Sequence, residues 1–242
     1  MKGVVLCGGS GSRLLPLTKV TNKHCLPVGK LPMIYHSIQK LVGAGIEKIC
    51  VVTGYEHVGV FATLLGDGSE LNCDLTYRVQ MKAGGIAQAL GLAKGFINPD
   101  EKMCVILGDN MFEDSLAPFA RDYALQKSGA MVLLKEVEDP ERFGVAEISG
   151  DIITHIEEKP KAPKSNKAVT GIYFYDYSVF RIIAGLRPSG RGEMEISDVN
   201  NAYLADGGLT FKTFEGWWTD AGTHESYAYA NELMGKAKGI TL

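Results

Sequence analysis

A glycine-rich segment near the amino terminus has the composition of a phosphate-binding loop. Three glycines fall within four positions in Gly8-Gly9-Ser10-Gly11-Ser12-Arg13. Glycines let a backbone turn sharply and bring its N–H groups close to an anion. A helix that begins after the loop would add partial positive charge from its N-terminus. A plain strand-to-helix turn would use the same glycines, but Arg13 and the nearby Lys23 favour phosphate binding.

Two better-known phosphate loops do not match this segment. Leu14 stands where a GxGxxG fingerprint needs its third glycine, and the GK[ST] ending of a Walker A loop is missing. The sequence therefore argues against a dinucleotide-dependent dehydrogenase and against a P-loop NTPase.

Two aspartates are candidate magnesium ligands. Asp109 follows the apolar run 104–107, and a carboxylate at the carboxyl end of a central parallel strand lies where open α/β sheets bind ligands. Asp220 lies in the segment Trp217-Trp218-Thr219-Asp220. Magnesium takes one or two carboxylates together with phosphate oxygens and water. The alternatives are a cap or turn role for Asp109, and for Asp220 a turn beside buried aromatic rings.

A third candidate cluster is Glu157-Glu158-Lys159-Pro160, at the end of a predicted strand. A lysine suits a sugar phosphate and a carboxylate can accept hydrogen bonds from sugar hydroxyls, although mixed charges at a strand end are also typical of a solvated edge. The five histidines show no metal-ligand spacing, and no nucleophile elbow or Ser/Cys–His pattern is present. Covalent catalysis therefore has no support.

Short β-branched runs and helical patterns alternate in the first half of the chain. Strands are predicted at residues 3–6, 49–52, 75–79 and 103–107. Helices are predicted after Pro32, ending at Gly43 or Gly45, then over 58–65 and 86–94, and from an N-cap at Ser115 towards Ser128. Such alternation predicts an α/β fold with a Rossmann-like, mainly parallel sheet and helices on both faces.

The second half has a different pattern. Strands are predicted at 131–137, 145–148, 152–156 and 172–175, and helices at 177–184, 195–205 and 224–235. No linker or repeat interrupts the chain, and residues 159–167 read as a loop. We expect one continuous domain over 1–242, with a smaller second lobe that covers the substrate.

The composition narrows the class of partner. The chain has 242 residues, 45% hydrophobic and 22% charged, with a net charge of −3. This balance disfavours binding to nucleic acid or to an anionic membrane. The five cysteines are odd in number and form no CxxC pair, and no signal peptide or membrane span is evident. We therefore expect a cytoplasmic protein.

The ordered blocks of the sequence closely resemble the sugar nucleotidyltransferase family, and within it the thymidylyltransferases. The matching segments span nearly the whole chain and include LCGGSGSRLLP, NKHCLPVGKLPMIY, GGIAQAL, LGDN, DPERFGV, EEKPKAPKSNKAVTGIYFYD, RGEMEISDVN and WWTDAGT. The resemblance implies an enzyme that joins dTTP to glucose 1-phosphate with the help of Mg²⁺, giving dTDP-glucose and pyrophosphate.

The resemblance also implies a single nucleotidyltransferase domain over 1–242, with nucleotide binding at about 1–130 and sugar-phosphate binding at about 131–242, and a role for individual residues. Nucleotide binding is implied for Leu6, Gly8, Gly9, Gly11, Ser12, Arg13, Gln80, Gly85 and Asp109; binding of the sugar phosphate for Gly144, Glu158, Lys159, Val169 and Trp218; catalysis for Arg13, Lys23, Asp109 and Lys159; and metal binding for Asp109 and Asp220. The sugar phosphate would attack the α-phosphorus in line, without a covalent intermediate and without a general base.

Some features depart from the family pattern. His24 replaces a usual glutamine, Phe143 a common tyrosine and Cys7 an alanine. The chain also resembles a short form that lacks a further helical C-terminal region. We therefore expect no second, regulatory nucleotide-sugar site and a homo-oligomer smaller than the usual tetramer. A UTP- or CTP-dependent enzyme and a non-catalytic nucleotide-sugar sensor are the alternative functions.

Overall fold

Four strands form the parallel half of a nine-stranded sheet in the computed structural model, which describes residues 1–236. The strands pair in the order β6-β1-β4-β5, with all three pairings parallel: β1 (Lys2–Cys7), β4 (Lys48–Gly54), β5 (Asp74–Gln80) and β6 (Met103–Leu107). The four strands predicted in the first half are confirmed. Their carboxyl ends meet at one edge, where the glycine loop follows β1, Gln80 ends β5 and Asp109 lies just beyond β6.

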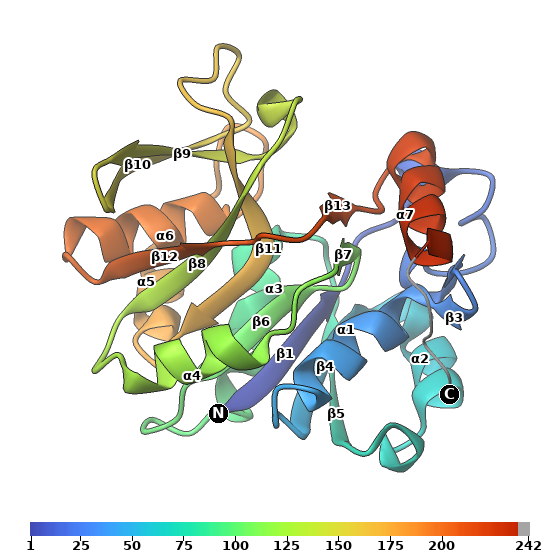
Figure 1. Ribbon diagram of the computed structural model, residues 1–242. Helices are drawn as coiled ribbons and strands as arrows, with labels where there is room; N and C mark the ends of the chain where they lie inside the picture. Colours follow the sequence, from blue (N-terminus) through green and yellow to red (C-terminus); the bar gives the residue numbers. More distant parts are fainter. Residues whose placement is uncertain (237–242) are drawn as a thin grey trace.

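The second half of the chain extends the same sheet with mostly antiparallel strands. β11 (Lys167–Tyr175) pairs antiparallel with β6, with β8 (Ala130–Glu136) and with β9 (Gly144–Ser149). β10 (Ile152–Glu158) in turn pairs with β9. These strands confirm the predictions for this half. β12 (Leu209–Thr213), which pairs parallel to β8, was not predicted. In Figure 1, β9 and β10 stand apart from the rest of the sheet, as an upper lobe.

Two apolar cores, one on each face of the sheet, hold the helices. One core takes the buried sides of α1 (Met33–Val42), α2 (Val58–Leu65) and α4 (Ala117–Leu125). The other takes those of α3 (Ile86–Gly91), α5 (Val179–Gly185) and α6 (Ile196–Ala205). The fold class is thus the predicted one, α/β with helices on both faces.

Two helix boundaries differ from the predictions. α4 ends at Leu125 because Gln126 is already extended, and its N-cap residue is Leu116. Ser115 still accepts a hydrogen bond from the N–H of Ala117 at 3.2 Å, so it supports the turn from one position earlier. The helix predicted over 86–94 stops at Gly91, a residue of low helix propensity, and continues as a 3-10 turn.

Two short ribbons and a last helix close the end of the sheet where the strands finish. β7 (Asn110–Phe112) pairs with β13 (Trp218–Asp220), and β2 (Pro27–Val28) with β3 (Leu31–Pro32). α7 (His224–Lys236) lies against the amino-terminal segment that holds β2 and β3 (Figure 1). Most of the Gly- and Lys-rich tail lies outside the described residues. No helix among residues 1–236 is long and apolar enough to cross a membrane.

Candidate active site

The glycine loop turns sharply after β1, but it does not lead into an α-helix. Gly9 and Gly11 have positive φ angles of 92° and 64°, and a Cβ on Gly11 would lie 2.9 Å from Thr18. Ser12–Leu14 form only a single 3-10 turn. Pro16 explains this, because it has no N–H to donate and restricts the residue before it to extended conformations. The predicted helix after the loop, with its added positive charge, is therefore wrong.

One wall of the site comes from the ends of β1 and β5. Leu6 and Gly8 face Gln80, whose side chain is 5% exposed. The Gln80 amide oxygen lies 2.3 Å from where a Gly8 Cβ would stand, so a larger residue at position 8 would displace that amide. Gly85 has a φ of 98°, and a Cβ on it would come within 2.5 Å of the Met194 carbonyl oxygen. Glycine at these two positions thus lets the Gln80 amide and the Met194 backbone approach closely.

Asp109 forms a partly buried ion pair with Lys23 just beyond the carboxyl end of β6. The Lys23 Nζ atom lies 2.5 Å from Asp109 Oδ2, and Asn110 donates to Oδ1 at 3.1 Å. Burial alone would raise the pKa of Asp109, but the charge of Lys23 and the nearby His24 hold it below its ordinary value. Asp109 is therefore ionised at neutral pH, and its partner lysine is held beside it.

The pairing of β13 with β7 brings Asp220 next to Asp109. Asp220 stands opposite Asn110 in the ribbon, and the N–H of Ala221 donates to the Asp109 carbonyl oxygen at 2.7 Å. Burial and the charge of Asp109 raise the pKa of Asp220. The Arg142 guanidinium donates to Asp220 Oδ1 at 2.7 Å and so opposes this rise. Two carboxylates and two basic groups therefore form one cluster.

The two carboxylates fit the requirements of a magnesium ion. Both face the small residue Gly222: the position of a Cβ there would be 3.0 Å from Asp220 Oδ2 and 3.6 Å from Asp109 Oδ2. The Arg13 Nη2 atom lies 3.1 Å from the same position, so any side chain on residue 222 would crowd both carboxylates and the guanidinium, and glycine avoids this. Within residues 1–236 no three His, Cys, Asp or Glu side chains converge as a metal cluster. A site with two carboxylates suits magnesium, which keeps water and substrate phosphates as its other ligands.

A second wall comes from neighbouring positions on β9, β10 and β11. Gly144 stands opposite Glu158 on one side and Val169 on the other. Burial raises the pKa of Glu158, whose carboxylate lies 4.0 Å from the Lys159 Nζ atom. Lys159 itself has a left-handed φ of 47°, and its N–H donates to the Phe143 carbonyl oxygen at 2.9 Å. The left-handed conformation of Lys159 thus ends β10 at Glu158.

Trp218 connects this wall to the carboxylates. Its indole N–H donates to Asn110 Oδ1 at 2.8 Å, and its ring packs edge-on against Phe143 at a centroid distance of 5.1 Å. The same Asn110 oxygen accepts from the N–H of Gly171. The tryptophan is thus fixed by polar and aromatic contacts at the border of the site.

A cavity of about 360 Å³ joins the two walls. Nearly all of the predicted site residues line it: Leu6, Gly8, Gly9, Arg13, Lys23, Gln80, Gly85, Asp109, Gly144, Glu158, Lys159, Val169, Trp218 and Asp220. Gly11 and Ser12 do not. Gly11 instead packs on Thr18, whose hydroxyl donates to the Gly11 carbonyl oxygen.

Two arginines at the site were not singled out from the sequence. Arg142 reaches Asp220 from the 3-10 turn before Gly144, and Arg191 lies 3.5 Å from Glu158 while pairing with Glu195 at 2.7 Å. Both lie in segments that resemble the family, DPERFGV and RGEMEIS. In a single sequence, however, each looks like an ordinary surface charge, because its acidic partner at the site is far along the chain.

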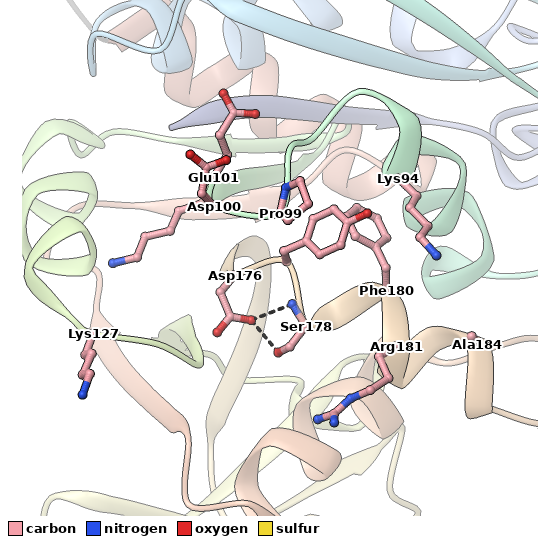
Figure 2. A pocket seen from close by; sticks show the side chains of 12 residues that line it. Lys94, Pro99, Asp100, Glu101, Lys127, Asp176, Ser178, Phe180, Arg181 and Ala184 are labelled. Atoms are coloured by element: carbon pink, nitrogen blue, oxygen red, sulfur yellow. Dashed lines mark hydrogen bonds between the residues drawn. The ribbon is translucent and has the colours of Figure 1, made fainter.

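A second, broader hollow lies at the opposite end of the sheet, where β6 begins and β11 ends. Figure 2 shows that Lys94, Lys127 and Arg181 stand around it at well-separated points. Asp176, in this hollow, accepts hydrogen bonds from the N–H and the hydroxyl of Ser178. This carboxylate therefore holds the turn between β11 and α5, and none of the predicted site residues lies here.

The chain is similar to known proteins along its whole length. Residues 2–237 match the family model described as nucleotidyl transferase. A glucose-1-phosphate thymidylyltransferase of Neisseria meningitidis is 46% identical, over 99% of this chain and 84% of that protein. One of Xanthomonas campestris pv. campestris is 43% identical, over 93% and 77%. A Bacillus anthracis protein provisionally identified as a glucose-1-phosphate thymidylyltransferase, solved with sucrose, has 56% identity and a TM-score of 0.95, covering 100% of this chain and 98% of that one.

Proposed function

This chain belongs to the nucleotidyl transferase family, and on that premise we propose that it transfers a thymidylyl group from dTTP to glucose 1-phosphate, releasing pyrophosphate. The observation that carries the proposal is the cluster of Lys23, Asp109, Asp220 and Arg142 at the junction of the two cavity walls. A reaction between two anions needs charge compensation at the place where they meet. Lys23 and Arg142, together with a divalent cation held by the two carboxylates, would supply it there.

The base and the sugar would occupy opposite walls. The wall formed by Leu6, Gly8 and Gln80 suits the nucleotide base, because a flat ring can lie close to glycine backbone beside one fixed amide. The wall with Glu158 and Lys159 suits the sugar phosphate. There a carboxylate can accept hydrogen bonds from hydroxyls, and a lysine can bind the phosphate.

The chain's own residues position the reactants rather than react with them. Arg13 and Lys23 would hold the triphosphate, and Lys159 would hold the attacking phosphate, so that their mutual repulsion is reduced and the oxygen is aligned with the α-phosphorus. Magnesium bound at Asp109 and Asp220 would add charge stabilisation for the phosphates. No residue needs to remove a proton, because the attacking phosphate oxygen is already ionised at neutral pH.

Pyrophosphate release measured with each of dTTP, UTP, CTP and ATP, and with glucose 1-phosphate as acceptor, tests this proposal. We expect dTTP to react fastest and excess EDTA to abolish the activity. UTP is the closest competitor, because uracil lacks only the methyl group of thymine, which is worth about 1–3 kcal/mol in an apolar pocket. No release with dTTP, or full activity in EDTA, would contradict the proposal.

The cytoplasm remains our proposed location for the protein. All five cysteines are free thiols, which fits a reducing compartment. The homo-oligomeric state stays a prediction, which analytical ultracentrifugation can measure.

A further inference from the structure

A glutamine outside the cavity contacts the amide that faces the base. Gln88 lies on α3, half-buried, and it does not line the cavity. Its Oε1 atom accepts a hydrogen bond from the Gln80 Nε2 atom at 2.6 Å. Gly84 makes this approach possible, because a Cβ there would lie 3.2 Å from Gln88 Cγ. Gln88 can therefore act on the base only through Gln80.

The surroundings fix which end of the Gln80 amide faces the cavity. The Nε2 atom also faces the Gly85 carbonyl oxygen, at 3.5 Å. A carbonyl oxygen can only accept, so the NH₂ group of Gln80 belongs on that side. The other end, the Oε1 atom, lies next to Gly8, 2.3 Å from where a Cβ on that residue would stand. Gln80 thus offers a hydrogen-bond acceptor to the ligand.

We propose that Gln88 is a specificity-determining positioning residue, which holds the Gln80 amide with its oxygen towards the base and so selects thymine or uracil against cytosine. The proposal rests on the proposed function. N3 of thymine and uracil carries a hydrogen and donates to such an oxygen, whereas N3 of cytosine is an acceptor. An acceptor facing an acceptor forms no hydrogen bond and leaves both atoms without a partner.

Removal of the Gln88 oxygen should relax this selection. Within residues 1–236, the Gly85 carbonyl at 3.5 Å would be the one remaining hydrogen-bond partner of the amide, and it is at the limit of hydrogen-bond length. The amide could then turn over and present its NH₂ group to cytosine. We expect the preference for dTTP over dCTP to fall at least about tenfold, which corresponds to about 1.4 kcal/mol.

Two matched substitutions test the proposal. Gln88→Met has nearly the same size without the carbonyl oxygen, whereas Gln88→Glu keeps an oxygen that can accept from Gln80. Dissociation constants for dTTP and dCTP, measured by calorimetry with Mg²⁺ and without sugar phosphate, give the ratio independently of turnover. Gln88→Met should lower the ratio at least tenfold, and Gln88→Glu should keep it within about threefold. Gln88→Leu serves as a second variant without the oxygen, and circular dichroism verifies that each variant is folded.

The outcomes separate this inference from the proposed function. An unchanged ratio in Gln88→Met and Gln88→Leu would overturn the inference, and so would an equal loss in Gln88→Glu, which would indicate a packing role. A wild-type protein without preference for dTTP over dCTP would overturn it as well. The proposed function fails by a different result, namely no pyrophosphate release by the wild-type protein from dTTP and glucose 1-phosphate.

Discussion

Replacement of Asp109 by Asn should remove most of the activity and leave the chain folded. The Lys23 Nζ atom lies 2.5 Å from Asp109 Oδ2, and each of the two side chains is 13% exposed. A buried charge that loses its partner costs about 3–5 kcal/mol. The asparagine oxygen can still accept a hydrogen bond from Lys23, so we expect a loss near the lower end, about 3 kcal/mol. Domains of this kind have about 5–15 kcal/mol of stability, and the variant should remain folded.

The variant should lose most of its turnover even though nearly all of the protein remains folded. The carboxylate is a proposed ligand of the metal that stabilises charge during the reaction, and loss of such stabilisation typically costs about 10²-fold or more in turnover. Pyrophosphate release at saturating dTTP and glucose 1-phosphate measures turnover, and urea unfolding measures the free energy of unfolding. Both are compared with the wild-type protein.

A surface ion pair provides the control. Asp122 pairs with Lys212 at 2.8 Å, and the two side chains are 50% and 48% exposed. Such pairs contribute only about 0–1 kcal/mol, so Asp122→Asn should change neither turnover nor stability appreciably. Turnover of Asp109→Asn within a few fold of the wild-type value would refute the assignment of Asp109 to the metal site.

Three further predictions concern the two walls and the core. Gln80→Ala should weaken the binding of dTTP and leave the binding of glucose 1-phosphate nearly unchanged, and Lys159→Ala should do the reverse. Calorimetric titrations that show equal effects on both ligands would argue against the two-wall arrangement. Gly85→Ala should lower the stability by more than about 1 kcal/mol, because φ is 98° and the new Cβ would meet the Met194 backbone at 2.5 Å; an unchanged urea midpoint would contradict this. Iodoacetamide at pH 8 should modify the half-buried Cys25 and Cys73 before the three buried thiols. Burial limits access of the reagent and raises the pKa of all five thiols. Mass spectrometry that finds the reverse order would contradict the packing of Cys7, Cys50 and Cys104.

Elements with a strong local signal were predictable from the sequence. β6 is a continuous apolar run and β1 is one after its first two residues, because both faces of the central sheet are covered by helices. β7 and β13 were missed, because each has only three residues and too few positions to show a pattern. The helix expected after the glycine loop was wrong, since the effect of Pro16 outweighed the favourable start.

The sequence by itself determined the residue types of the site and their order along the chain. The glycines, Lys23, Asp109 and Lys159 could be named, because a turn, a strand end and a resemblance to a family are all local or ordered features. Only the tertiary structure decided which of them meet. Asp109 and Asp220 are neighbours because β7 pairs with β13. Arg142 reaches Asp220, and Gln88 sets the direction of Gln80, through side-chain contacts that depend on how the elements pack. The physical reason is that strand and turn signals act over a few residues, whereas a contact across the sheet depends on the packing of the whole core.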